Sequence, residues 1–235
     1  MKTVDEIWNW ATELNPDVQM EELTEYVTIA KNVYKYPDRV LEFQKLLTKW
    51  ESSVSERPGI TTLPLPYWTS TNIIENLLGY GADEYEQSSS EVEYIYFFRN
   101  NTQKFKSNES LNKELYTGNC LLPHNDSSDD ETESRIFILN LNKRPVRTGF
   151  WSMNGEVIGD ENLTDELIEY YNDINLGNLE EKTNNGILDN VLNVEYNFNE
   201  AIFYNGKAYH QPCIDNYYTK DNPRIMFRIG FDLES

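Results

Sequence analysis

Five short segments, rich in β-branched and aromatic residues and bounded by polar turns, most restrict the fold of this 235-residue sequence. Each has the length and composition typical of a β-strand. Most of them have no helical pattern between them, which favours a sandwich or a barrel. We therefore predict strands at residues 93–99, 135–141, 148–153, 200–205 and 224–231.

The N-terminal part has a different pattern. From Val4 to about Trp50 apolar residues recur at helical spacing, and Pro37-Asp38 is typical of a helix start. Helix breakers then accumulate between residues 55 and 68. We predict a mainly β protein with flanking helices (α+β), in which a helical lead-in, residues 1–57, packs on a barrel domain, residues 58–235, as one compact unit. Within that domain, residues 160–195 are predicted to form a helix at about 164–171 followed by an inserted loop.

The charge balance excludes some partners. The sequence has 40 acidic and 20 basic residues, a net charge of −20, and no cluster of basic residues that would track a phosphate backbone. Nucleic acid is therefore disfavoured as a partner. No apolar run of about 18 residues occurs, and acids occupy the N-terminus, so no membrane association is expected. We expect a cytoplasmic monomer; two cysteines are too few for a disulfide framework.

The two histidines of the sequence suggest a metal site. His124 precedes Asp126 by two residues, and His210 follows a predicted strand far along the chain. In an extended segment, residues i and i+2 point to the same face, so His124 and Asp126 can reach one ion. Two histidines and one carboxylate form the facial triad that holds iron(II) and leaves coordination positions open. The alternative is a chance His-x-Asp in an acidic loop.

Zinc is a competing metal. Cys120 lies four residues before His124, and Cys213 lies three residues after His210, which together make the kind of Cys/His set that zinc prefers. If Cys120 and His124 share one strand, however, they lie about 13 Å apart, which is too far for a single ion. This spacing makes zinc the less favoured reading.

The last predicted strand carries two arginines on one face. Within residues 224–231, Arg224 and Arg228 alternate with apolar residues that would face the core. Both arginines therefore fall on the opposite face of the strand. If that face lines the interior of a barrel, the guanidiniums need an anion, and a dicarboxylate cosubstrate would serve. On an edge strand they would instead be solvated or paired with acids.

These pieces resemble the iron(II)- and 2-oxoglutarate-dependent oxygenases, in particular their prolyl-4-hydroxylase-like branch, which includes small phage-encoded members. The resemblance covers about residues 116–231, and more weakly residues 33–43, and rests on the order and spacing of several motifs. Met226 departs from the family, which usually has Ser or Thr there, and the gap from His210 to Arg224 is longer than usual. The motifs are residues 116–126, 135–142, 148–151, 201–212 and 222–227.

The resemblance implies a double-stranded β-helix, a jelly-roll barrel related to the cupins, with helices packed outside. It implies that Fe(II) is held by His124, Asp126 and His210, and that 2-oxoglutarate and O2 are cosubstrates. Arg224 would bind the far carboxylate of 2-oxoglutarate, with Tyr116 as a hydrogen-bond donor and Arg228 as a rival anchor. The implied reaction is hydroxylation of an unactivated carbon, with succinate and CO2 as co-products.

The substrate is less defined by the sequence. The resemblance points to a prolyl or other peptidyl residue, and residues 67–93 and 160–195 are expected to form mobile walls that clamp an extended neutral or basic peptide. A small-molecule substrate stays open. Trp151 and Tyr209 are read as pocket walls or as core. The alternatives to this enzyme are a non-catalytic jelly-roll binding or structural protein and a cupin-like metalloenzyme that does not use 2-oxoglutarate; a viral chain would act in the host cytoplasm.

Overall fold

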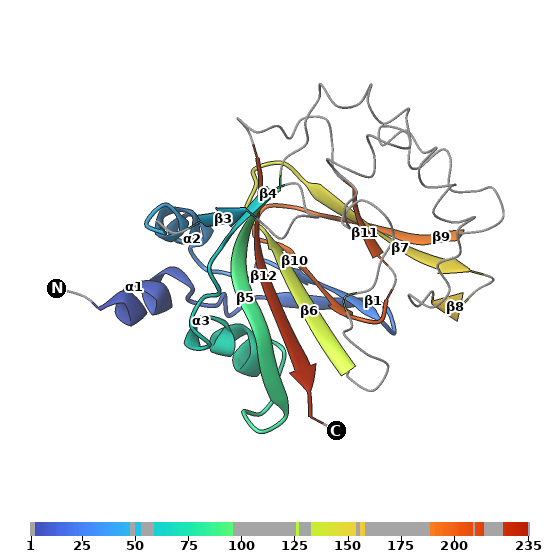
Figure 1. Ribbon diagram of the computed structural model, residues 1–235, viewed down its shortest axis with the longest axis horizontal. Helices are drawn as coiled ribbons and strands as arrows, with labels where there is room; N and C mark the ends of the chain where they lie inside the picture. Colours follow the sequence, from blue (N-terminus) through green and yellow to red (C-terminus); the bar gives the residue numbers. More distant parts are fainter. Residues whose placement is uncertain are drawn as a thin grey trace.

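A computed structural model describes residues 3–47, 50–52, 59–95, 126, 133–153, 156–157, 189–208, 210–213 and 223–234. In these residues two β-sheets pack together, and helical segments gather on the other side of the larger sheet (Figure 1). All strand pairs in both sheets are antiparallel.

The larger sheet has the strand order β1-β2-β10-β6-β12-β5-β4-β3. The smaller sheet has the order β11-β7-β8, and β9 also pairs with β7. The strands of the larger sheet are β1 (Gln19–Thr24), β2 (Val27–Lys31), β3 (Trp50–Ser52), β4 (Gly59–Thr62), β5 (Tyr85–Ile95), β6 (Glu133–Asn140), β10 (Ala201–Asn205) and β12 (Arg224–Leu233). Those of the smaller sheet are β7 (Val146–Met153), β8 (Glu156–Val157), β9 (Asp189–Tyr196) and β11 (His210–Cys213).

This topology is a double-stranded β-helix, as predicted. Strands far apart in sequence are neighbours: β6 lies between β10 and β12, and β7 lies between β9 and β11. The chain therefore passes back and forth between the two sheets, which closes the barrel around one interior. The five predicted strands are all confirmed, within β5, β6, β7, β10 and β12, as far as their residues are described.

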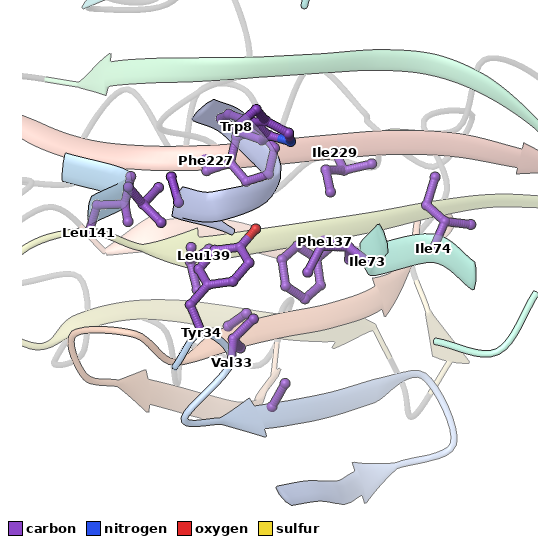
Figure 2. Packing of buried hydrophobic residues seen from close by; sticks show 14 of the residues in the cluster. Trp8, Val33, Tyr34, Ile73, Ile74, Phe137, Leu139, Leu141, Phe227 and Ile229 are labelled. Carbon is purple, nitrogen blue, oxygen red and sulfur yellow. The ribbon is translucent and has the colours of Figure 1, made fainter. Parts of the chain in front are cut away.

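Strand alternation divides the larger sheet into an outer and an inner face. In β6, Phe137 and Leu139 belong to an outer hydrophobic core, whereas Ile136 belongs to an inner one. The outer core packs against α1 (Val4–Ala11), α2 (Pro37–Gln44) and the helical segments α3 (Trp68–Thr71) and η1 (Asn72–Leu77). Figure 2 shows its central side chains, among them Trp8, Ile73, Phe137 and Phe227.

Trp8 anchors the N-terminal helix on this outer face. Its ring makes edge contacts with Phe43 and Phe227, at centroid distances of 4.7 and 5.5 Å. Its indole N–H donates to the carbonyl of Thr69 at 3.0 Å, so a buried polar group is satisfied in an apolar environment. The prediction of N-terminal helices packed outside the barrel is confirmed for α1 and α2.

The inner core lies between the two sheets and surrounds the barrel interior. It is apolar for most of its length, so the few polar side chains that reach it stand out and are candidates for function. Its buried members are Val27, Ile29, Ile136, Val146, Phe150, Val194, Tyr196, Ile202, Tyr204, Ala208 and Met226.

Two predictions about segments were wrong. Residues 19–31 are not helical: they form the hairpin β1–β2, because Val27 and Ile29 alternate onto the inner face and β2 pairs with β10. The division into residues 1–57 and 58–235 stays a prediction. Residues 189–195, predicted as loop, belong to β9, which pairs with β7.

The segment at residues 67–93 is not a mobile wall. It contains α3, η1 and most of β5, and Ile73 and Ile74 are buried in the outer core. Apolar side chains inside this polar-looking stretch fix it to the sheet. The predicted helix at 164–171 lies outside the described residues. No helix in the described part of the chain is long and apolar enough to span a membrane.

Candidate active site

His210 is the first residue of β11 and faces the barrel interior. It is 4% exposed and pairs across the strands with Phe150 of β7. Its Nδ1 lies 3.0 Å from the carbonyl oxygen of Ala208. Because a carbonyl only accepts, Nδ1 carries a proton, and in the neutral imidazole Nε2 keeps a lone pair directed into the interior. This is the tautomer that a metal ligand needs.

Asp126 reaches the same point from another part of the chain. Its backbone N–H donates to the carbonyl of Gly206 at 2.8 Å, so the turn after β10 holds it. Residue 206 approaches β6 closely, since an added Cβ would lie 2.8 Å from Cβ of Ser134, and only glycine fits. The Asp126 carboxylate is largely buried, with Oδ2 3.4 Å from Nε2 of His210.

Tyr204 of β10 lies between these two groups. Its hydroxyl is 3.1 Å from Oδ2 of Asp126 and 3.0 Å from Nε2 of His210. Burial, and next the charge of Asp126, raise the pKa of the Tyr204 hydroxyl well above its usual value, although Arg228 opposes this shift. The hydroxyl therefore stays protonated and has one hydrogen to donate to either acceptor.

We expect Tyr204→Phe to weaken Mn(II) binding about tenfold, since loss of a partner that orients a metal ligand typically costs 10- to 100-fold. The ring would still pack on Phe150, with which it makes an edge contact at 5.4 Å, so the fold should be retained. Titration calorimetry measures the affinity and circular dichroism the fold. Unchanged affinity would show that the hydroxyl does not orient the ligands.

Arg228 of β12 also faces this group. Its Nη2 lies 3.4 Å from Oδ2 of Asp126, and its side chain is 13% exposed. The carboxylate of Asp126 thus has a guanidinium, a phenol and an imidazole around one oxygen. In a largely buried setting such a cation helps to keep the carboxylate ionised, which is the form that binds a metal.

Arg224 forms a second polar group in the interior, four residues along the same strand. It is 2% exposed. Its Nη2 donates to the Tyr196 hydroxyl at 2.9 Å, and its Nε donates to Sδ of Met226 at 3.3 Å. The Tyr196 hydroxyl is in turn 3.3 Å from Oγ1 of Thr148. Nη1 is buried and has no hydrogen-bond partner in the described part of the chain.

The predicted site residues are thus partly brought together. Asp126, His210 and Arg228 form one cluster and Arg224 lies farther along the same inner face, whereas His124, Tyr116, Cys120 and Tyr209 lie outside the described residues. The side chains of Trp151 and Cys213 also lie outside what the structure describes. Among the described residues no group of three or more His, Cys, Asp or Glu side chains could hold a metal ion. The metal triad and the zinc alternative, which both need residues beyond this part, stay predictions.

Sequence reasoning missed three polar residues of the interior: Tyr204, Tyr196 and Thr148. Tyr204 could have been found, because it alternates with Ile202 in a predicted strand and lies six residues before His210. Tyr196 alternates with Leu192 and Val194, but this signal was hidden by the prediction of a loop. All three face inward with the inner core.

No protein-family model matches the chain, and no curated protein matches it either. Among solved structures, it is similar to the non-heme alpha ketoglutarate dependent epimerase SnoN from nogalamycin biosynthesis, with a TM-score of 0.46, 13% identity and coverage of 88% of this chain and 78% of that one. For the carbocyclase SnoK from the same biosynthesis, the TM-score is 0.41 at 13% identity, covering 83% of this chain and 71% of that one.

A third similar structure is an oxidoreductase of the 2OG-Fe(II) oxygenase family from Burkholderia pseudomallei. Its TM-score is 0.35 at 9% identity, and the match covers 97% of this chain and 77% of that one. Because the TM-scores of these three structures lie below 0.5, they carry no argument about function. Function is therefore argued from the side chains in the barrel interior.

Proposed function

We propose that this chain is an Fe(II)- and 2-oxoglutarate-dependent oxygenase. One observation carries the proposal: the barrel interior buries the Arg224 guanidinium, whose Nη1 lacks a partner among the described residues, and also holds the paired Asp126 carboxylate and His210 imidazole. A buried cation with an unsatisfied donor is costly, and a bound carboxylate would remove that cost. A ligand that is both a carboxylate and a metal chelator suits these two groups together.

The donor set fits iron(II). Asp126 offers an oxygen and His210 its Nε2 nitrogen, in the required tautomer, and we assign His124 as the third ligand on sequence grounds. Two imidazoles and one carboxylate leave positions for other ligands, as an oxygenase requires. When bound, the iron with 2-oxoglutarate and O2 supplies the oxidising chemistry, in which the keto acid is converted to succinate and CO2.

The protein's own contribution is binding and orientation. The Tyr204 hydroxyl fixes the positions of the Asp126 and His210 side chains relative to each other. The ring of Phe150 packs near both Tyr204 and His210 and keeps water from that side. Excluding water strengthens the electrostatic interactions within the site. His210 is thus held on β11 and Asp126 by its backbone contact with the turn after β10, which favours a fixed geometry.

Arg224 is assigned to the far carboxylate of 2-oxoglutarate. Its Nη1 and the hydroxyls of Tyr196 and Thr148 provide the hydrogen-bonding groups at this end of the barrel. The Ser or Thr that the family usually has two residues after the arginine is Met226 here, and its sulfur accepts from Nε of Arg224. Tyr196 would then supply the missing hydroxyl, and Tyr116 stays a proposed further donor.

For the prime substrate we propose a peptidyl residue, prolyl or other, that is hydroxylated at an unactivated carbon. This rests on the family resemblance, because residues 67–93 are part of the packed fold and provide no mobile wall. With a net charge of −20 the protein favours a neutral or basic peptide over an acidic one. A different substrate class would leave the proposed oxygenase activity itself unchanged.

We expect the purified protein with Fe(II), 2-oxoglutarate and O2 to form succinate slowly without any prime substrate. Proline-containing peptides should raise this rate, and lysine-flanked ones should lose their advantage in high salt, because exposed charges are screened over about 10 Å at roughly 0.1 M. A turnover assay compares the peptides with free amino acids, nucleosides and single-stranded DNA.

The same assay separates the alternatives. A metal-binding protein that makes no succinate would be a cupin-like enzyme of other chemistry, and one that binds neither metal nor keto acid would be a non-catalytic jelly-roll module. Stimulation by a free amino acid or a nucleoside alone would move the proposed activity to small-molecule oxidation.

A further inference from the structure

Two asparagines form a hydrogen-bonded side-chain network close to the backbone at Arg224: Asn140, the last residue of β6, and Asn142, two residues after it. Asn140 is fully buried. Its Oδ1 accepts from both the backbone N–H and the side-chain Nδ2 of Asn142, each at 2.8 Å. Its Nδ2 donates to the carbonyls of Arg144 and Tyr196, at 3.1 and 3.0 Å. Every donor and acceptor of this buried amide is therefore satisfied.

Asn142 continues the network to β12. Its Oδ1 accepts from the backbone N–H of Ile225 at 2.9 Å, and its Nδ2 donates to the carbonyl of the same residue at 2.9 Å. The β6–β12 ladder ends at the pair Met226↔Asn140. The amide of Asn142 therefore prolongs the ladder past its end and fixes the residue that directly follows Arg224.

The network thus contacts both members of the hydrogen-bonded pair that Arg224 forms with Tyr196. Asn140 binds the carbonyl of Tyr196, whose hydroxyl accepts from Arg224, and Asn142 binds the backbone next to Arg224 itself. These bonds connect β9 of the smaller sheet with β12 of the larger sheet. The relative position of the Tyr196 hydroxyl and the Arg224 guanidinium depends on this connection.

We infer that Asn142, supported by Asn140, is a positioning residue that aims the Arg224 guanidinium and so sets the affinity for the anion that it binds. The inference rests on the proposed function, since it takes the carboxylate of 2-oxoglutarate as that anion. Among the described residues, the side chain of Arg224 has two hydrogen-bond partners, the Tyr196 hydroxyl and the Met226 sulfur. The orientation of the Arg224 guanidinium therefore depends on the position of its backbone. A guanidinium that is displaced from its ion-pairing partner loses much of the binding energy.

The test is Asn142→Ala, compared with a matched control. Asn199 offers the control because its side-chain amide pairs in the same way with the backbone of Tyr34, at 2.9 and 2.8 Å, while its contact with Asn140 is made by the backbone N–H, which the substitution keeps. Its φ of 66° suits glycine, so Asn199→Gly removes the amide without backbone strain. Both variants lose one bidentate contact between a side-chain amide and the backbone of a single residue.

With Mn(II) present, we expect Asn142→Ala to bind N-oxalylglycine about tenfold more weakly, as loss of an orienting partner typically does. The KM for 2-oxoglutarate should rise by a similar factor, with kcat within about twofold of the parent value. Mn(II) affinity should not change. Asn199→Gly should lose comparable thermal stability and keep the parent affinity for N-oxalylglycine.

The inference is overturned if Asn142→Ala loses stability but keeps its affinity for N-oxalylglycine, because the amide would then have only a structural role. Asn142→Ser serves as the second variant if the alanine variant does not fold. Arg224→Met distinguishes failure of the positioning role of Asn142 from failure of the anion site itself. If Arg224→Met weakens N-oxalylglycine and Asn142→Ala does not, positioning fails alone; if Arg224→Met has no effect, the anion site of the proposed function fails and the inference fails with it.

Discussion

Replacing His210 with alanine is expected to abolish tight Mn(II) binding while the barrel stays folded. His210 presents its Nε2 to Asp126 and the Tyr204 hydroxyl, and the chain has only one other histidine, His124. The loss should exceed the roughly 10- to 100-fold that removal of a residue hydrogen-bonded to a metal ligand costs. Because His210 lies at the first position of β11 and is flanked by Phe150, the surrounding apolar core remains. Titration calorimetry with Mn(II) gives the affinity.

Two comparisons make the metal experiment specific. Asp126→Asn should also lose Mn(II), whereas Asp38→Asn should not, because Asp38 is an exposed carboxylate paired with Lys143 at 3.0 Å. His124→Ala tests the ligand that lies outside the described residues. Retained Mn(II) affinity in either histidine variant would contradict the facial triad.

The fold was predictable where one strand face had to be apolar. In β12, Phe227 and Ile229 belong to the outer core, while Arg224 and Arg228 lie on the other face, as the alternation indicates. This periodicity is local, so it can be read without knowing which strand lies beside it. An anion site on this face requires that the arginines lie in the barrel interior, and Arg224 is buried there while Arg228 is largely buried.

The hairpin at residues 19–31 shows why the rest could not be predicted. Met20, Leu23, Val27 and Ala30 recur three or four residues apart, which is the spacing of a helix face. Their strand conformation depends on pairing of β2 with β10, some 170 residues away along the chain. Tertiary pairing therefore overrides a local pattern that is compatible with both structures.

The candidate site also has a part that the sequence predicts and a part that it does not. The His-x-Asp spacing and the alternation of the arginines are local, and Asp126, Arg224 and Arg228, the members of these patterns that the structure describes, lie in the barrel interior. The contacts of Tyr204 with Asp126 and of Tyr196 with Arg224 join residues 78 and 28 positions apart. No sequence spacing reports such contacts, because they follow from which strands are neighbours in the two sheets.

Arg224→Met is expected to weaken 2-oxoglutarate binding by roughly 2 to 3 kcal/mol, the value for a charge-assisted hydrogen-bonded pair in a buried site. Methionine keeps the apolar contacts of the side chain but removes the donors, among them the unpartnered Nη1 and the Nη2 bound to Tyr196. Calorimetry with N-oxalylglycine in the presence of Mn(II) measures the change, and Mn(II) affinity should stay constant.

Arg228→Met is the matched comparison for this prediction, because Arg228 lies on the same face of β12 but contacts Asp126 instead of Tyr196. We expect it to weaken N-oxalylglycine less than Arg224→Met does. Arg135→Met is a second control: Arg135 lies on β6, pairs with Glu133, and should have no effect on the ligand. If Arg228 proved the more sensitive position, the far carboxylate would bind beside Asp126, and the assignment of the two arginines would have to be exchanged.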